Sequence, residues 1–331
     1  MEKRATIKDV AKMAGVSIST ASLAINGKDG VTEKTKKLVL DAVEKLSYQP
    51  DSAARNMRAS GTKVIGLLIP DVRNNFYGEI IEHIRREVES YGFFLLLGIT
   101  GSSNNEKKYI SEFISRRVDG IIWVPQLTYV NDMEHIKELD KYHIPYLFLA
   151  ADYEQSNAPF VMCNLKKGSY MMTKYLLERD IRDIKFLVGD KRVDEPYVSG
   201  YRKALGEAGL SYDERNVYES PYHFEDAQKI AIEIIKEKPE AIMTNSDFTA
   251  CAVLQAARQK GLSIPRDLSV CGYDDVIYAT INQIPMTTVR QPIERMCKLV
   301  VNNLMNQLRY GIVPDSVILE PSLVIRDTVR N

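Results

Sequence analysis

Residues 17–26 carry hydroxyl, amide and short apolar side chains but no charged group. On a helix over these residues, the outward positions would be Ile18, Ser19, Ser22 and Leu23. An uncharged surface of this kind can enter the major groove of DNA and meet base edges without desolvating a charge. The chemistry that this run favours is therefore the reading of a base sequence by hydrogen bonds and apolar contacts.

Two short helices joined by a tight turn are predicted to position this run. Thr6 is a suitable N-cap for the first helix, and Asp9 follows it at capping-box spacing. Ala14-Gly15 marks a break, and Ser17 can cap a second helix. The buried face of that helix is expected to comprise Ala21, Ala24 and Ile25. Small residues at the crossing suit a helix-turn-helix, although any small helical hairpin has a similar pattern.

The segment after these helices helps to distinguish a helix-turn-helix from an ordinary helical hairpin. A third helix, capped by Thr32, leads into Tyr48-Gln49-Pro50-Asp51-Ser52-Ala53-Ala54-Arg55-Asn56-Met57-Arg58. Pro50 ends that helix, and Asp51 can cap a following helix of barely two turns. The run from Thr6 to Pro70 resembles the headpiece, hinge and first strand of the LacI family of bacterial repressors. The family's hinge motif is Tyr-x-Pro-Asn-x-x-Ala-Arg-x-Leu, and this chain has Asp51 for the Asn and Met57 for the Leu.

Charge is divided unevenly along the chain. The 331 residues include 44 basic and 44 acidic ones, but residues 1–63 have a net charge of +5 and the remainder −5. A basic head on an acidic body is expected where only one end meets phosphates. The four cysteines are far apart, which predicts reduced thiols. There is no signal peptide and no apolar run of about 20 residues, which predicts a soluble cytoplasmic protein with no membrane partner.

From Val64 onward, apolar runs alternate with amphipathic helices in two series, the second of which starts after Asn164. This pattern predicts an α/β body of two doubly wound parallel sheets, with ligands at the carboxyl ends of the strands. The resemblance implies a two-lobed, periplasmic-binding-protein-like body that the chain crosses near 161–163, 289–292 and 320–322. The expected domains are a helix-turn-helix headpiece (1–50), a hinge helix (51–62) and an effector-binding and dimerisation domain (63–331; N-lobe 63–161 and 291–320, C-lobe 162–290 and 321–331).

An enzyme is not expected from the motifs. No GxGxxG follows a strand, and GxxxxGK[ST] is absent. The four histidines occur singly, with neither metal-ligand spacing nor a nucleophile motif beside them. We therefore predict no catalytic residue, no metal site and no cofactor.

The resemblance implies two groups of DNA contacts. Phosphate contacts fall on Thr6, Ser17, Thr20, Ser22 and Asn26, although Thr6 and Ser17 are equally explained as helix caps. Base contacts fall on Ile18, Ser19 and Leu23. Leu23 occupies a position that is usually Arg in the family, so apolar contact replaces a bidentate contact to guanine.

At the hinge, the resemblance implies a minor-groove wedge at Met57, flanked by Ala54 and Arg55. The alternative for Met57 is a surface methionine on a linker. A wedge of this type needs two hinge helices packed across a dyad, which predicts a homodimer on a near-palindromic double-stranded DNA operator. The chain ends at Arg330-Asn331 without the leucine-heptad tail of the family's tetramers, which also favours a dimer.

The resemblance places effector contacts at strand ends and helix starts: Asn75, Phe76, Tyr77, Lys191, Tyr197, Tyr222, Asp247 and Asp274. Phe76 is equally explained as lobe core. Tyr197 stands where the family usually has an Arg that forks onto ligand oxygens, and this exchange favours a neutral ring over an anion. A sugar is the expected effector. A nucleoside, a phosphosugar, a protein co-repressor or no small ligand are the alternatives.

The implied protein is a sequence-specific transcriptional regulator, a repressor of a carbohydrate-utilisation operon. Effector in the cleft between the lobes would shift the N-lobes and so set the packing of the hinge helices and the affinity for DNA. The sequence does not give the sign of this effect. A sugar-binding receptor of the periplasmic type is the alternative from another class, and the headpiece argues against it.

Overall fold

The computed structural model describes residues 5–25, 30–46, 48, 61–101, 103–125, 134–151, 156–220 and 223–331. The chain divides into two compact units, Met1–Thr62 and Lys63–Asn331. Most of the segment for which a hinge helix is predicted, 51–62, lies outside the described residues.

The first unit contains three short helices: α1 (Ile7–Ala14), α2 (Ile18–Ile25) and α3 (Glu33–Lys45). Each contacts the other two around a small core of Val10, Ala11, Ala21, Ala24, Val39 and Ala42. Gly15 ends α1 in the left-handed conformation, with φ of 67°, which a residue without a Cβ adopts readily. The predicted helix-turn-helix is present, with Ile25 only partly buried.

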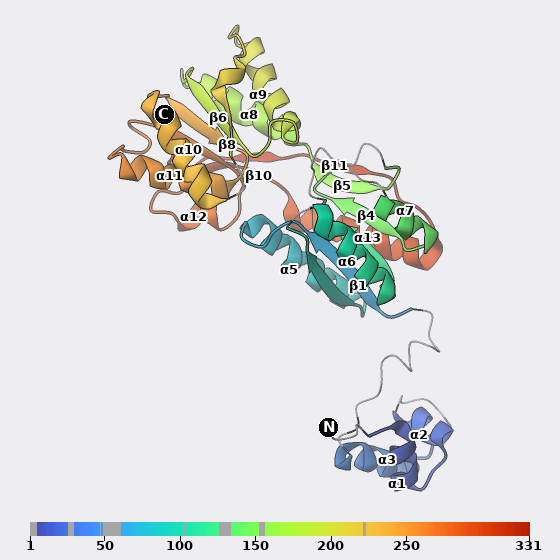
Figure 1. Cartoon of the computed structure of the whole chain (residues 1–331). Helices are drawn as coiled ribbons and strands as arrows, with labels where there is room; N and C mark the ends of the chain where they lie inside the picture. Colours follow the sequence, from blue (N-terminus) through green and yellow to red (C-terminus); the bar gives the residue numbers. More distant parts are fainter. Residues whose placement is uncertain are drawn as a thin grey trace. The chain divides into compact units, whose positions relative to one another are not determined.

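The N-lobe of the second unit is a six-stranded sheet in the order β11-β5-β4-β3-β1-β2, with every pairing parallel. Helices α5 and α13 pack on one face over one apolar core, and α6 and α7 cover the other (Figure 1). The elements are β1 (Val64–Ile69), α5 (Asn75–Ser90), β2 (Phe94–Ile99), α6 (Ser103–Ser115), β3 (Gly120–Trp123), α7 (Glu134–Lys141), β4 (Tyr146–Leu149), β5 (Phe160–Cys163), α13 (Ile293–Tyr310) and β11 (Val317–Leu319).

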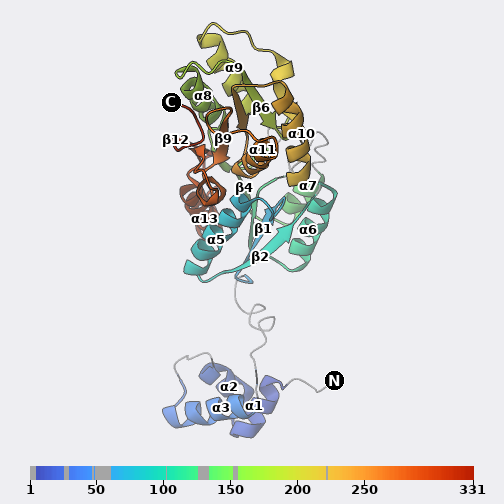
Figure 2. The ribbon, with the colours of Figure 1, turned by 90° about the vertical axis from the view of Figure 1, so that its left-hand side faces the viewer.

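The C-lobe repeats this architecture with the strand order β12-β10-β9-β8-β6-β7. Helices α8 and α9 pack on one face, and α10 and α11 on the other (Figure 2). The elements are α8 (Leu165–Leu177), β6 (Ile184–Val188), α9 (Glu195–Glu207), a 3₁₀ turn (Glu214–Asn216), β7 (Val217–Glu219), α10 (Phe224–Lys236), β8 (Ala241–Thr244), α11 (Asp247–Gln259), β9 (Ser269–Asp274), α12 (Tyr278–Ile281), β10 (Thr287–Arg290) and β12 (Ser322–Val324).

The chain passes between the lobes three times: between β5 and α8, between β10 and α13, and between β11 and β12. The last crossing is direct, so β12 enters the second sheet beside β10 and runs antiparallel to it. The second sheet is therefore parallel apart from this edge strand, and the predicted fold of two doubly wound α/β sheets is present.

The four cysteines are free thiols. Within the described residues, no three His, Cys, Asp or Glu side chains are grouped so that they could hold a metal ion. No helix in the described part of the chain combines the length and apolar character needed to span a membrane.

Candidate functional sites

The amino-terminal end of α2 presents an uncharged, hydroxyl-rich surface. The Ser17 hydroxyl accepts a hydrogen bond from the Thr20 backbone N–H at 3.1 Å, as an N-cap does. The same hydroxyl lies 2.8 Å from the Thr20 hydroxyl and 3.0 Å from that of Ser19. Capping fixes these hydroxyls at the helix end, where backbone N–H groups and the helix dipole favour an anion such as phosphate.

Thr6 is held at the start of α1 by reciprocal contacts with Asp9. The Thr6 backbone N–H and hydroxyl donate to the Asp9 carboxylate at 2.8 Å and 2.6 Å. The capping interpretation of Thr6 is therefore satisfied by the geometry, whether or not the residue also touches a phosphate.

The residues assigned to base reading differ in exposure. Ile18 is 48% exposed and Ser19 is exposed, whereas Ser22 and Leu23 are half-buried. Because Ala21 and Ala24 face the core, helical spacing places Ser19 opposite the core, with Ser22 and Leu23 on either side of it. Ile18 lies at the edge of this surface. Four predicted DNA contacts, Asn26, Ala54, Arg55 and Met57, lie outside the described residues.

A cavity of about 490 Å³ lies between the two lobes of the body. Its wall comes from the loops that follow β1, β3, β4, β6, β8 and β10, together with the end of β9. These are carboxyl ends of strands in both sheets, the position at which doubly wound folds bind ligands. Its polar wall residues include Asp71, Arg73, Asn74, Asp194, His223, Asn245, Ser246, Asp274 and Gln291.

Four of the predicted effector residues line this cavity: Phe76, Tyr77, Tyr197 and Asp274. Phe76 also belongs to the N-lobe core, so both interpretations of this residue hold. The Tyr197 ring packs edge-on against Tyr273, with 4.9 Å between centroids. Burial and nearby carboxylates, Asp274 first among them, raise the pKa of Tyr77, which keeps its hydroxyl protonated and able to donate.

Asp247 does not line the cavity. Its carboxylate is fully buried and accepts hydrogen bonds from the Val276 backbone N–H at 2.8 Å and the Thr288 hydroxyl at 2.5 Å. A Cβ on Gly272 would lie 2.2 Å from Asp247 Oδ1, so only glycine fits beside it. Asp247 therefore links the start of α11 to the segment after β9 and to β10 through these hydrogen bonds. Burial raises the pKa of its carboxyl group to about 7.

Two further predicted effector residues also lie off the cavity wall. The Asn75 side-chain amide donates to Glu79 at 3.3 Å along α5. Lys191 faces Glu214, with 3.8 Å between Nζ and Oε1, and its backbone N–H donates to Glu219. Both polar groups are turned toward neighbours on the lobe surface. Tyr222 lies outside the described residues.

The sequence reasoning missed two polar residues of the wall, Asp194 and Gln291. Asp194 accepts from the Gly189 backbone N–H at 2.7 Å and from the Asn245 amide at 2.8 Å, at the start of α9. The Gln291 amide donates to Asp274 at 2.8 Å. Both residues follow the carboxyl end of a strand, and that rule, applied to every strand, finds them.

A third missed group is an arginine with its partners. Arg73 makes a bidentate contact with Asp71: Nη2 and Nε lie 2.6 Å and 2.9 Å from Oδ2, and Nε lies 3.1 Å from Oδ1. Its Nη1 lies 2.8 Å from His223 Nδ1. Since a guanidinium only donates, the imidazole nitrogen is the acceptor in this contact. His223 is therefore part of the cavity wall rather than an isolated histidine.

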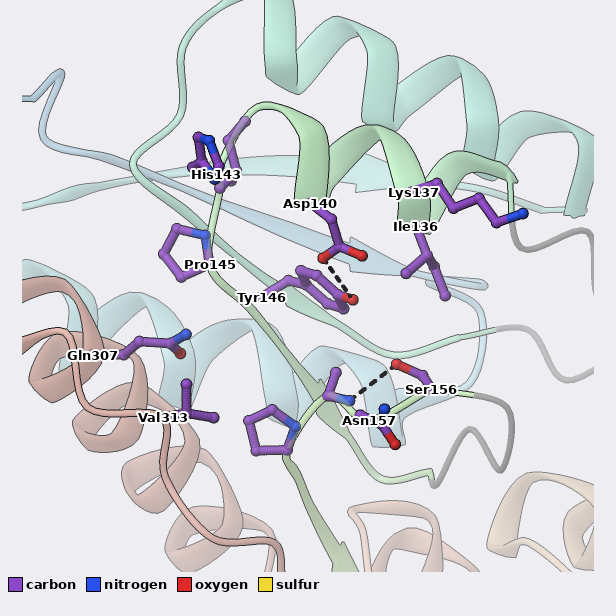
Figure 3. Close-up of a pocket in the computed structure, with 13 residues that line it drawn as sticks. Ile136, Lys137, Asp140, His143, Pro145, Tyr146, Ser156, Asn157, Gln307 and Val313 are labelled. Carbon is purple, nitrogen blue, oxygen red and sulfur yellow. Dashed lines mark hydrogen bonds between the residues drawn. The ribbon is translucent and has the colours of Figure 1, made fainter.

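A second cavity, of about 610 Å³, opens on the N-lobe away from these residues. Figure 3 shows its wall, in which Asp140 accepts a hydrogen bond from the Tyr146 hydroxyl at 3.3 Å and Gln307 approaches from α13. None of the predicted contacts contributes to it.

Comparison with known proteins places the chain in a family. Residues 6–51 match "Bacterial regulatory proteins, lacI family", and residues 173–329 match "Periplasmic binding protein-like domain". The HTH-type transcriptional repressor PurR of Vibrio campbellii is 33% identical over 335 residues, which cover 98% of this chain and 99% of that protein. The chain belongs to the LacI family. It is a DNA-binding transcriptional regulator with an effector domain, not an enzyme.

Further relatives agree with this assignment. The HTH-type transcriptional regulator DegA of Bacillus subtilis is 33% identical to the LacI-family chain over 88% of each protein. The complex of the transcriptional regulator CelR with cellobiose superposes with a TM-score of 0.74 at 26% identity and covers 98% of this chain and all of that one. A lac repressor dimer bound to operator and the anti-inducer ONPF has the same fold, with a TM-score of 0.85 at 22% identity and coverage of 98% and 99%.

Proposed function

We propose that this LacI-family regulator is a cytoplasmic repressor of a carbohydrate-utilisation operon and that a sugar in the inter-lobe cavity controls its affinity for DNA. The observation that carries this proposal is the cavity itself. It is walled by strand ends of both lobes, so a ligand there contacts both and favours one arrangement of the lobes over another. Carboxylate and amide acceptors beside aromatic rings suit a hydroxylated ring.

The similarity to CelR, which was solved in complex with cellobiose, supports a sugar. Other relatives are repressors named PurR, so similarity alone does not choose the effector. Tyr197 also favours a sugar. A tyrosine at the position where the family usually has an arginine offers no bidentate donor for an anionic group on the ligand.

For DNA recognition we propose contacts from Thr6, Ser17, Thr20, Ser22 and Asn26 to phosphates, from Ile18, Ser19 and Leu23 to bases, and from Ala54, Arg55 and Met57 in the minor groove. We further propose that the domains follow the boundaries 1–50, 51–62 and 63–331. The uncharged, partly exposed surface of α2 supports the base contacts.

We propose a homodimer formed through the edge of the N-lobe sheet. Strand β2 is an edge strand, and it exposes Phe94 (73% exposed) and Leu97, with Val72 also exposed on the same lobe. An exposed apolar edge of this kind favours association with another chain. A second copy is the partner that supports a two-fold symmetric operator, and the lac repressor of the same fold binds its operator as a dimer. Phe94→Glu should give a monomer in sedimentation velocity, whereas Tyr310→Glu, on another exposed ring, should leave a dimer.

The function is tested by selecting bound fragments from genomic DNA with the purified full-length protein. Enrichment of a near-palindromic sequence beside genes for uptake and breakdown of one sugar is the expected result. A chain lacking residues 1–60 is the control, and it should bind no fragment while it still binds ligand. Palindromes beside purine or nucleoside genes would contradict the sugar assignment but leave the regulator assignment in place.

A further inference from the structure

We propose that the inter-lobe cavity binds a ligand with a primary ammonium group, an amino sugar rather than a plain sugar, and that this ammonium sits on Asp274 and Gln291. This inference rests on the proposed function, because it takes the cavity to be the effector site. It goes beyond that function by assigning a charge and a hydrogen-bonding group to the ligand.

The first observation is the charge of the described cavity wall. Its carboxylates are Asp71, Asp194 and Asp274, and its guanidinium is Arg73. Arg73 is engaged by Asp71 through a bidentate contact, with 2.6 Å between Nη2 and Oδ2. The wall therefore holds more carboxylates than guanidinium groups, and its arginine is already matched. A phosphate or carboxylate on the ligand would meet this excess of negative charge with no unmatched guanidinium among the described wall residues.

The second observation is the arrangement of Asp274 and Gln291. Their side chains are 4% and 5% exposed, and Gln291 Nε2 donates to Asp274 Oδ1 at 2.8 Å. Gln291 Oε1 is buried and has no hydrogen-bond partner among the described residues. A buried amide oxygen without a partner is unfavourable. One hydrogen-bonded pair of cavity-wall residues thus combines a carboxylate with an amide oxygen that lacks a partner.

The surroundings of Asp274 do not favour its negative charge. Burial raises the pKa of Asp274 well above its ordinary value, and the nearby Asp247 carboxylate adds to this effect. Asp194 is better supported, because a backbone N–H and an amide donate to it. Asp274 is therefore the wall carboxylate that gains most from a cation supplied by the ligand.

A primary ammonium matches this pair better than a hydroxyl. A hydroxyl has one hydrogen to donate, so it serves either the carboxylate or the amide oxygen. An ammonium has three, so it can donate to both and also supplies the positive charge. The remainder of the cavity, with Phe76, Tyr77 and Phe248 in its wall, suits a compact ring. An amino sugar combines the two parts.

The test is isothermal titration of the full-length protein at pH 7 with matched ligands. The panel comprises three aldohexoses (glucose, galactose and mannose), the 2-amino-2-deoxy derivative of each, and the N-acetyl derivative of each amine. Ethanolamine and putrescine supply an ammonium without a sugar. Hydrogen bonds to a charged group are stronger than neutral ones by enough to give about a tenfold difference. We expect one amino sugar to bind at least about tenfold more tightly than its parent sugar and its N-acetyl derivative.

Two variants test whether the ammonium group binds at Asp274 or elsewhere on the cavity wall. Asp274→Asn removes the charge and should reduce the preference for the amino sugar over its parent to less than about threefold. Asp71→Asn removes a carboxylate that is already matched by Arg73, so it should shift the affinities for both ligands alike. Thermal unfolding of each variant without ligand shows whether it is folded.

The outcomes distinguish this inference from the proposed function. A parent sugar that binds as tightly as its amine overturns the inference and leaves the sugar effector in place. If ethanolamine or putrescine binds and no sugar does, the proposed ammonium site is supported. The proposal of a sugar effector is then wrong. If no member of the panel binds, or if Asp274→Asn keeps the full preference, the inference is wrong. The genomic selection reports on DNA binding independently of all these results.

Discussion

The two binding regions of this molecule are built in opposite ways. The surface of α2 is uncharged and largely open, and its polar atoms are short hydroxyls that also serve as the helix cap. The cavity wall is charged and partly buried, and several of its polar groups are hydrogen-bonded to a second wall residue: Asp274 to Gln291, Asp194 to Asn245, and Asp71 to Arg73.

This difference predicts how readily each region tolerates amino-acid substitutions. A half-buried surface position such as Leu23 can differ from the family's usual arginine at little expense to the fold, so base preference can diverge between members. A buried wall residue is fixed by its partners and by close packing, so a substitution there changes the shape of the cavity before it changes specificity.

A substitution at Gly200 tests how closely helices α8 and α9 pack behind the cavity wall. Gly200 lies in α9, and an added Cβ would come within 2.1 Å of the Lys166 carbonyl oxygen in α8. Backbone atoms cannot move aside cheaply, so Gly200→Ala should lower the free energy of unfolding by about 3 kcal/mol. Gly206 in the same helix has open space around it, and Gly206→Ala should instead raise stability by about 0.5–1 kcal/mol. Denaturant unfolding of both variants measures this, and equal effects would contradict the packing argument.

Asp247 tests the buried charge of the C-lobe. Burial raises its pKa from 3.8 to about 7, so the folded protein binds this proton more tightly than the unfolded chain does. Stability is therefore expected to fall as the pH rises from about 4 to about 7 and then to level off, with a loss of about 4 kcal/mol from this group. Asp247→Asn should flatten that slope, although Asp274, whose pKa is also raised, retains part of it. Thermal midpoints between pH 5 and pH 8 measure the slope, and an unchanged profile in the variant would rule out Asp247 as its source.

The same contrast explains what the sequence could predict. The helix-turn-helix and the two series of strands and helices follow from local spacing. The cavity wall could be predicted only in part, because a residue beside a strand end can face the cavity or the core. Asp247 faces the core, since Gly272 leaves room for its carboxylate there. Gln291 follows the carboxyl end of β10, so the strand-end rule finds the residue, but its hydrogen bond to Asp274 cannot be predicted from the local sequence.

Leu23 tests the open surface of α2. Leu23→Arg would place a bidentate donor at a position that now offers apolar contact. Operator preference should change at one symmetric pair of positions, by about 1–3 kcal/mol at each base pair, because arginine favours guanine. Stability should change little, because the residue is only half-buried. Selection from random DNA with both proteins measures the preference, and an identical selected sequence would show that Leu23 does not read bases.

Ser17 separates capping from DNA contact within the open surface. Ser17→Ala removes the acceptor for the Thr20 N–H and should lower the stability of the headpiece by about 1 kcal/mol. Ser17→Asp keeps an acceptor at the N-cap and should retain that stability, but it places a negative charge where a phosphate is expected. If Ser17 contacts DNA as well as capping α2, the aspartate variant should be as stable as the original protein and bind operator much more weakly. Equal operator affinity in a stable Ser17→Asp protein would mean that Ser17 is a cap alone, because a phosphate contact cannot survive the added charge.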